Sequence, residues 1–170
     1  MTTDHGTVFR TLHQPGNPFI LANAWDVGSA LMLQGMGAKA IATSSAALAF
    51  TLGTRDMGHI TRDQSLAHAQ DLIAAVNVPV SGDFENGFGE DPDTCAETVR
   101  MAGEIGLAGI CIEDTTFPDG GFYDFDLAVE TAGPQQGFVQ HIRTVGGCDN
   151  DNAFIAVKPV HFNQQLVQCL

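Results

Sequence analysis

The chain has 170 residues, 44% of them hydrophobic, and its mean hydropathy is close to zero. This length allows one domain with a real core and excludes two of ordinary size. A net charge of −13 argues against nucleic acid or an anionic membrane surface as a partner. No apolar run approaches the roughly 20 residues that span a bilayer. The first residues lack the features of a signal peptide, so we expect a cytoplasmic protein.

The charge is unevenly distributed. Residues 1–130 carry the whole net negative charge, whereas residues 131–170 contain two acidic and two basic residues. The composition therefore changes near residue 130. We expect two parts: a regular domain over 1–130 and an irregular tail over 131–170.

Residues 1–130 alternate between apolar strands and helices. Residues 7–13 are compatible with a short first helix. Four strands are predicted, each an apolar run that ends in polar residues: 19–24, 38–45, 78–84 and 107–112. Helices are predicted over 28–36, from the capping box of Thr61 and Gln64 to 76, and from the N-cap Asp91 to 105. This order predicts an α/β fold with a parallel sheet.

Two sheet architectures fit units of this length, a (β/α)8 barrel and a doubly wound sheet. No G-x-G-x-x-G motif follows the first strand, which disfavours a dinucleotide-binding sheet. A complete barrel takes about 250 residues, so four units cannot close one. In the tail, Phe138–Val145 and Ala153–Val160 have strand-like composition, but no amphipathic helix lies between them.

The stretch 78–89 carries the strongest chemical signal. Asp83 and Glu85 follow an apolar run and precede a glycine-rich loop. Residues two apart in a strand point to the same face, and α/β barrels build their active sites at the carboxyl ends of strands. Two converging carboxylates suit Mg²⁺. The alternative is a solvated acidic turn.

Other polar residues follow the neighbouring strands. Ser44 and Ser45 end the second strand, Asp56 lies in the next loop, and Glu113 ends the fourth strand. Each also has a structural interpretation: the serines as helix caps, Asp56 as the partner of an arginine, and Glu113 as an N-cap. Together at one edge, they could hold a metal ion against an α-keto acid or enolate. His59 and His68, outside this group, are expected on a loop and on a helix surface.

At these residues the sequence resembles the isocitrate lyase/phosphoenolpyruvate mutase superfamily, over about residues 8–130. The segments that carry the resemblance are 24–30 (AWDVGSA), 42–46 (ATSSA), Asp56 with 61–63 (TRD), 79–89 (PVSGDFENGFG) and 106–114 (GLAGICIED). The resemblance implies a (β/α)8 TIM-barrel fold, represented here by its first four βα units.

The resemblance also implies roles for single residues. Ser44 would contact a carboxylate or enolate oxygen of the substrate, with the backbone N–H groups of Ser45 and Ala46. Asp83 would be the principal ligand of Mg²⁺, with Mn²⁺ as a substitute, and Glu85 stands where the family often has Asp. Glu113 and Asp56 would hold water molecules on the metal. The implied partners are a small carboxylic acid and further copies of the same chain.

Two departures from the family pattern narrow this expectation. The lyases carry a Lys-Lys-Cys-Gly-His loop after the residue equivalent to Glu113, whereas this chain reads Thr115–Gly121 without lysine or cysteine. Cleavage of isocitrate or methylisocitrate by that route is therefore not expected. The family continues with a fifth strand that ends in a substrate-binding arginine, and Arg143 does not match it. The tail resembles the product of a frameshift or truncation.

The predicted function is that of a magnesium-dependent lyase or mutase. Such an enzyme would cleave or rearrange a C–C or P–C bond of a small α-keto or 2-hydroxy acid through a pyruvate enolate. Two alternatives stay open. One is a catalytically inactive half-barrel that associates through its exposed sheet edges. The other is an enzyme similar to ketopantoate hydroxymethyltransferase.

Overall fold

The computed structural model describes residues 4–117, 120–129, 131 and 166–169. The helices are α1 (His5–Leu12), α2 (Val27–Gly35), α3 (Ser45–Thr51), α4 (Arg62–Ala75) and α5 (Pro92–Glu104). The strands are β1 (Ala22–Asn23), β2 (Ile41–Ala42), β3 (Val80–Asp83), β4 (Gly109–Ile112), β5 (Thr115–Thr116), β6 (Gly121–Phe122) and β7 (Leu166–Cys169). Residues 125–129 are also helical.

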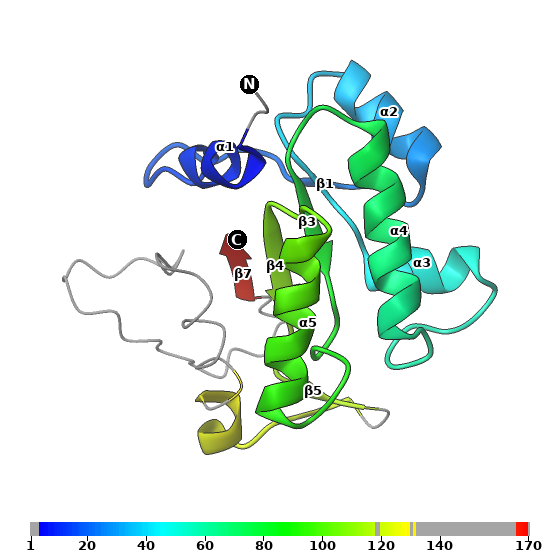
Figure 1. Ribbon diagram of the computed structural model, residues 1–170, viewed down its shortest axis with the longest axis vertical. Coiled ribbons are helices and arrows are strands. Elements are labelled where there is room, and N and C mark those ends of the chain that lie inside the picture. Colours follow the sequence, from blue (N-terminus) through cyan, green and yellow to red (C-terminus); the bar gives the residue numbers. More distant parts are fainter. Residues whose placement is uncertain (1–3, 118–119, 130, 132–165, 170) are drawn as a thin grey trace.

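The main sheet has the strand order β1-β2-β3-β4-β7. The first four strands are parallel and neighbour one another in chain order, with Asp83 of β3 opposite Cys111 of β4. β7 pairs with β4 in the antiparallel direction (Figure 1). Consecutive parallel strands joined by helices are the repeating unit of a (β/α)8 barrel, and the carboxyl ends of β1–β4 therefore meet along one edge.

Helices α2, α4 and α5 lie on the same side of the sheet (Figure 1). The main core lies between these helices and the strands. Its members are apolar residues of both layers, among them Ile41, Leu72, Val80, Phe84, Val99 and Ile110, all with 0–2% of their surface exposed. Burial of such side chains stabilises the fold by about 1.5–3 kcal/mol each.

A smaller core lies under α1. Phe9 is fully buried there and packs with Ala40 and Ala108, which precede β2 and β4. Its ring meets those of His13 and Phe19 edge to face, with centroids 4.5 Å and 6.3 Å away. Helix α1 thus covers the amino ends of the strands, opposite the edge where the acidic residues lie.

Local signals set the helix boundaries as predicted. Thr61 and Gln64 form the expected capping box of α4, with each side chain accepting a hydrogen bond from the other residue's backbone N–H. The Asp91 side chain caps α5, whose first residue is Pro92. Gly106 follows α5 with φ +91°, a left-handed conformation in which glycine has no steric cost.

Several expectations about local structure were wrong. The strands are two to four residues long, shorter than predicted. The segment 115–121, expected to be a loop, contains β5 and the first residue of its partner strand β6. His68, expected on a helix surface, is half-buried: its Nε2 atom has no hydrogen-bond partner among the described residues, and burial lowers its pKa.

Within the tail, the structure describes only residues 131 and 166–169. Residues 166–169 form β7, so this part of the expected irregular tail pairs with the sheet. The strand-like segments 138–145 and 153–160, and Arg143, lie outside the described residues. The division into 1–130 and 131–170 stays a prediction. Among the described helices, none is both long and apolar enough to cross a membrane.

A substitution at Gly82 in β3 tests how tightly the core is packed around this strand. A Cβ atom at this position would lie 2.2 Å from the Phe84 ring and 2.8 Å from Leu107 Cδ1. Gly82→Ala should therefore lower the free energy of unfolding by about 1–3 kcal/mol, as overpacking does. Gly103→Ala in α5, where a Cβ meets nothing within 4 Å, should leave it unchanged or raise it by up to about 1 kcal/mol. Equal urea midpoints for the two variants would contradict this description of the core.

Candidate active site

Asp83 is the last residue of β3 and joins this strand to its neighbour. Its Oδ2 atom accepts hydrogen bonds from the backbone N–H and the hydroxyl of Ser45, at 3.0 and 3.1 Å. Its own backbone N–H donates to the Thr43 hydroxyl at 2.8 Å. Asp83 is 9% exposed. The carboxylate is therefore fixed between the end of β3 and the start of α3.

Glu85 lies beyond the strand in a tight turn. Its φ of +48° is left-handed, which is uncommon for a residue other than glycine. Its Oε1 atom accepts a hydrogen bond from the Gly58 N–H at 3.2 Å, and 2% of the residue is exposed. The strand rule that placed Asp83 and Glu85 on one face does not apply, because β3 ends at Asp83. The turn brings Glu85 to the loop after α3 instead.

Glu113 and Asp56 complete the acidic group. The backbone N–H of Glu113 donates to the Glu85 carbonyl at 2.7 Å, and its carboxylate accepts a hydrogen bond from the Thr115 hydroxyl at 3.3 Å. Glu113 precedes β5, so it does not cap a helix. Asp56 is half-exposed and makes no ion pair with an arginine in the described part of the chain.

The carboxyl groups disfavour one another's charge. Burial raises the pKa of Asp83, and the charge of Asp56 adds to this effect. Burial raises the pKa of Glu85 to about 7, with contributions from the charges of Asp56, Asp83 and Glu113. Burial and the charge of Asp83 raise the pKa of Glu113. Three neighbouring carboxyl groups are thus held where their ionised forms are unfavourable.

This donor set fits a divalent cation in its chemistry. Among the described residues, the ion pairs are those of Arg100 with Glu97 and Glu104 on α5, so no side-chain cation neutralises the acidic group. Hard carboxylate oxygens are what Mg²⁺ prefers. In the same part of the chain, however, no three His, Cys, Asp or Glu side chains are arranged to ligate one ion. The carboxylates therefore suit an ion that keeps several of its water molecules and takes few protein ligands directly, as Mg²⁺ does.

The residues after β2 cap α3. The Ser44 hydroxyl accepts a hydrogen bond from the Ala47 N–H at 3.4 Å, which makes Ser44 the N-cap. The hydroxyl proton can still be donated elsewhere. The Ser45 N–H donates to Asp83. Of the two backbone groups expected to contact a substrate, only the Ala46 N–H is therefore without a hydrogen-bond partner among the described residues.

A pocket of about 580 Å³ adjoins this group. Glu85 forms part of its wall. Its other lining residues come from the loop before α4, the starts of α4 and α5, the turn after Glu85 and the segment after β5, among them Gly58, Arg62, Asn86, Phe88, Thr94 and Phe117. Asp83, Glu113 and Ser44 are not among the lining residues. Glu85 is therefore the member of the acidic group that reaches the pocket.

Sequence reasoning did not predict the hydrogen bonds that support the acidic group from neighbouring segments. Thr43 and Gly58 contribute a hydroxyl and a backbone N–H. Tyr123 and Asn86 form a buried hydrogen bond at 3.0 Å. Thr43 lies at a predicted strand end, which was a usable signal. The other contacts join residues 27 or more positions apart, and no local pattern marks them.

The fold and the position of the acidic residues define a barrel-type α/β protein with a candidate site at the carboxyl ends of its strands. The family model described as phosphoenolpyruvate phosphomutase matches residues 9–136. The chain belongs to this family, within the isocitrate lyase/phosphoenolpyruvate mutase superfamily, and the predicted relationship is confirmed. Its described residues form the first units of the (β/α)8 fold.

Individual relatives and solved structures are consistent with membership of this family. An uncharacterized protein of Mycobacterium tuberculosis is 40% identical over 108 residues, which is 64% of this chain and 40% of that protein. The 2-methylisocitrate lyase of Aeropyrum pernix is 32% identical over 113 residues, 66% of this chain and 36% of the lyase. A Burkholderia cenocepacia J2315 structure, whose assignment as a lyase/mutase is provisional, aligns with a TM-score of 0.75 and 45% identity over 78% of this chain and 48% of that one. The chain thus spans about two fifths of the curated relatives and half of the solved structure.

The raised pKa of Glu85 predicts a pH dependence of stability. The folded pKa of about 7 lies above the ordinary value of 4.5, so the folded state binds the proton more tightly. This contribution to stability is complete below about pH 4.5 and is lost as the pH rises through 7. Metal-free wild type should therefore lose free energy of unfolding relative to Glu85→Gln over this range, measured by urea denaturation.

The control for this experiment is Glu97→Gln. Glu97 lies on the surface of α5, and its hydrogen bond with Arg100 lowers the pKa of its carboxyl group. Wild type should not lose stability relative to this variant as the pH rises. Parallel stability curves for wild type and Glu85→Gln would show that Glu85 titrates normally.

Proposed function

We propose that this chain carries the metal-binding part of a magnesium-dependent lyase or mutase. The substrate would be a small α-keto or 2-hydroxy acid. Cleavage or rearrangement would break a C–C or P–C bond, and the electron pair of that bond would pass to the pyruvate fragment as an enolate. The relatives support the general class, because they include lyases that act on branched hydroxy acids, by their names 2-methylisocitrate and 2,3-dimethylmalate.

The observation that carries the proposal is the group of uncompensated carboxyl groups at the strand ends. Asp83, Glu85 and Glu113 come from two adjacent strands, and burial together with mutual repulsion raises the pKa of each. A protein gains no stability from such an arrangement. A bound cation would offset both burial and repulsion, and this favours a functional role for the group.

Each residue has a distinct part in this proposal. Asp83 and Glu85 would hold Mg²⁺ directly, and Glu113 and Asp56 through water. When bound, the metal supplies positive charge that stabilises the enolate oxygen and carboxylate. The Ser44 hydroxyl and the Ala46 N–H at the start of α3 would orient the substrate carboxylate. The hydrogen bonds from Ser45 hold Oδ2 of Asp83, and Oδ1 accepts a hydrogen bond from the Glu85 N–H at 3.3 Å.

The segment after Glu113 limits which substrates the proposed enzyme could cleave. In place of the lysine- and cysteine-containing loop of the lyases, this chain has β5, β6 and their connection, with Thr115, Thr116 and Phe117. None of these side chains is a general acid near neutral pH. We therefore propose substrates whose cleavage to an enolate does not need a cysteine as the general acid. Oxaloacetate and phosphonopyruvate are the first two to test.

Asp83→Asn should abolish turnover of oxaloacetate or phosphonopyruvate in the presence of Mg²⁺, a loss of at least about 100-fold. The neutral amide keeps the shape but removes the charge that binds the metal. Asp71→Asn, an exposed residue of α4, is the matched control and should keep full activity. Release of pyruvate in a coupled assay is the measurement. Equal activity of wild type and Asp83→Asn would contradict the assignment.

A further inference from the structure

The hydroxyl of Tyr123 lies against the turn that contains Glu85. It accepts a hydrogen bond from Asn86 Nδ2 at 3.0 Å and donates one to the Gly89 carbonyl at 3.4 Å. Tyr123 is 7% exposed and is the single tyrosine of the chain. A buried hydroxyl with two partners in one turn constrains that turn.

The turn needs such a constraint, because its backbone is strained. Glu85 and Phe88 have φ of +48° and +65°, and Gly87 between them has +83°. Left-handed conformations of residues other than glycine cost on the order of 1–3 kcal/mol each and persist only where the surroundings impose them. Inside the turn, the Phe88 N–H donates to Asn86 Oδ1 at 3.1 Å. Asn86 therefore links the turn to Tyr123.

The backbone of Tyr123 is held by the segment that carries Glu113. Its N–H donates to the Asp114 carbonyl at 3.0 Å, and β5 and β6 pair between these two residues. One end of Tyr123 is thus fixed next to Glu113, and its hydroxyl is fixed next to Glu85.

The same segment also reaches the other partner of Glu85. Phe117 packs so closely on Gly58 that a Cβ at Gly58 would lie 3.1 Å from it. Gly58 donates the hydrogen bond to Glu85 Oε1. Phe117 therefore contacts the loop that binds the Glu85 carboxylate, and Tyr123 contacts the turn that contains Glu85.

We propose that Tyr123 is a positioning residue that fixes Glu85 relative to Glu113 and thereby sets the affinity of the site for a divalent cation. This inference rests on the metal site of the proposed function. Tyr123 does not touch the metal. It acts through Asn86 on the turn, as residues behind metal ligands do in other proteins.

Titration with Mn²⁺, followed by the spectroscopic signal of the free ion, tests this role. Tyr123→Phe removes the hydroxyl and keeps the ring, and its dissociation constant for Mn²⁺ should rise about 10-fold. Thr51→Val is the matched control, because it removes a hydroxyl that bonds only within α3, and its affinity should not change. Melting temperatures of all variants separate a loss of affinity from a loss of folding.

Asn86→Ala removes the same hydrogen bond from the other side. This variant replaces Tyr123→Phe in the titration if Tyr123→Phe is not folded at the temperature of the measurement. The double variant should lose less Mn²⁺ affinity than the sum of the two single losses, because both changes break the Asn86–Tyr123 hydrogen bond. Mn²⁺ binding by Tyr123→Phe as tight as that of wild type would overturn the role of Tyr123 alone. No Mn²⁺ binding by wild type would overturn the proposed metal site and this inference with it.

Discussion

The pairing of Asp83 with Ser45 and Thr43 is the interaction on which the rest of the site depends. Asp83 accepts two hydrogen bonds from Ser45 and donates one to Thr43, so the ends of β2 and β3 are joined in both directions. These hydrogen bonds hold β2 and β3 together at their carboxyl ends and fix where α3 begins. A carboxylate that would otherwise be free in solvent becomes a structural part of two βα units.

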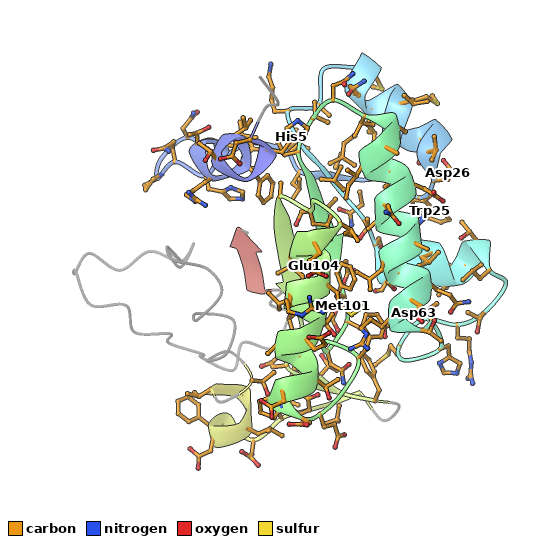
Figure 2. The ribbon with its side chains drawn as sticks, in the orientation of Figure 1. His5, Trp25, Asp26, Asp63, Met101 and Glu104 are labelled. Atoms are coloured by element: carbon orange, nitrogen blue, oxygen red, sulfur yellow. The ribbon has the colours of Figure 1, made fainter. Side chains whose placement is uncertain are left out.

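Glu85 and Glu113 lie beside Asp83 in positions that are energetically unfavourable for them. Glu85 adopts a left-handed backbone, and Glu113 lies where the charge of Asp83 raises its pKa. Supports from distant segments hold them there: Gly58, Asn86 and Tyr123. Strain and repulsion concentrated in one place, with tight packing beneath it, are characteristic of sites that bind ligands. Figure 2 labels Trp25 and Asp26 beside α4, between β1 and α2, where the Trp25 ring lies 6.3 Å from that of Phe50 in α3.

The sequence predicted what local interactions decide. The order of elements, the capping of α4 by Thr61 and the start of α5 at Pro92 follow from neighbouring residues, and the structure has them. The acidic residues were also placed at the correct strand ends. The left-handed turn at Glu85 was missed because the partners that impose it are far away in the sequence. Strands β5 and β6 were missed because two residues each are too few for any periodicity.

The central claim is that a divalent cation binds at the carboxyl ends of β3 and β4. Anomalous scattering from crystals of the chain soaked in Mn²⁺ tests it most directly, because it locates the ion without reference to activity. The account predicts a peak within ligand distance of Asp83 and next to Glu85 and Glu113. A peak only at other surface carboxylates, with none beside Asp83, would contradict it.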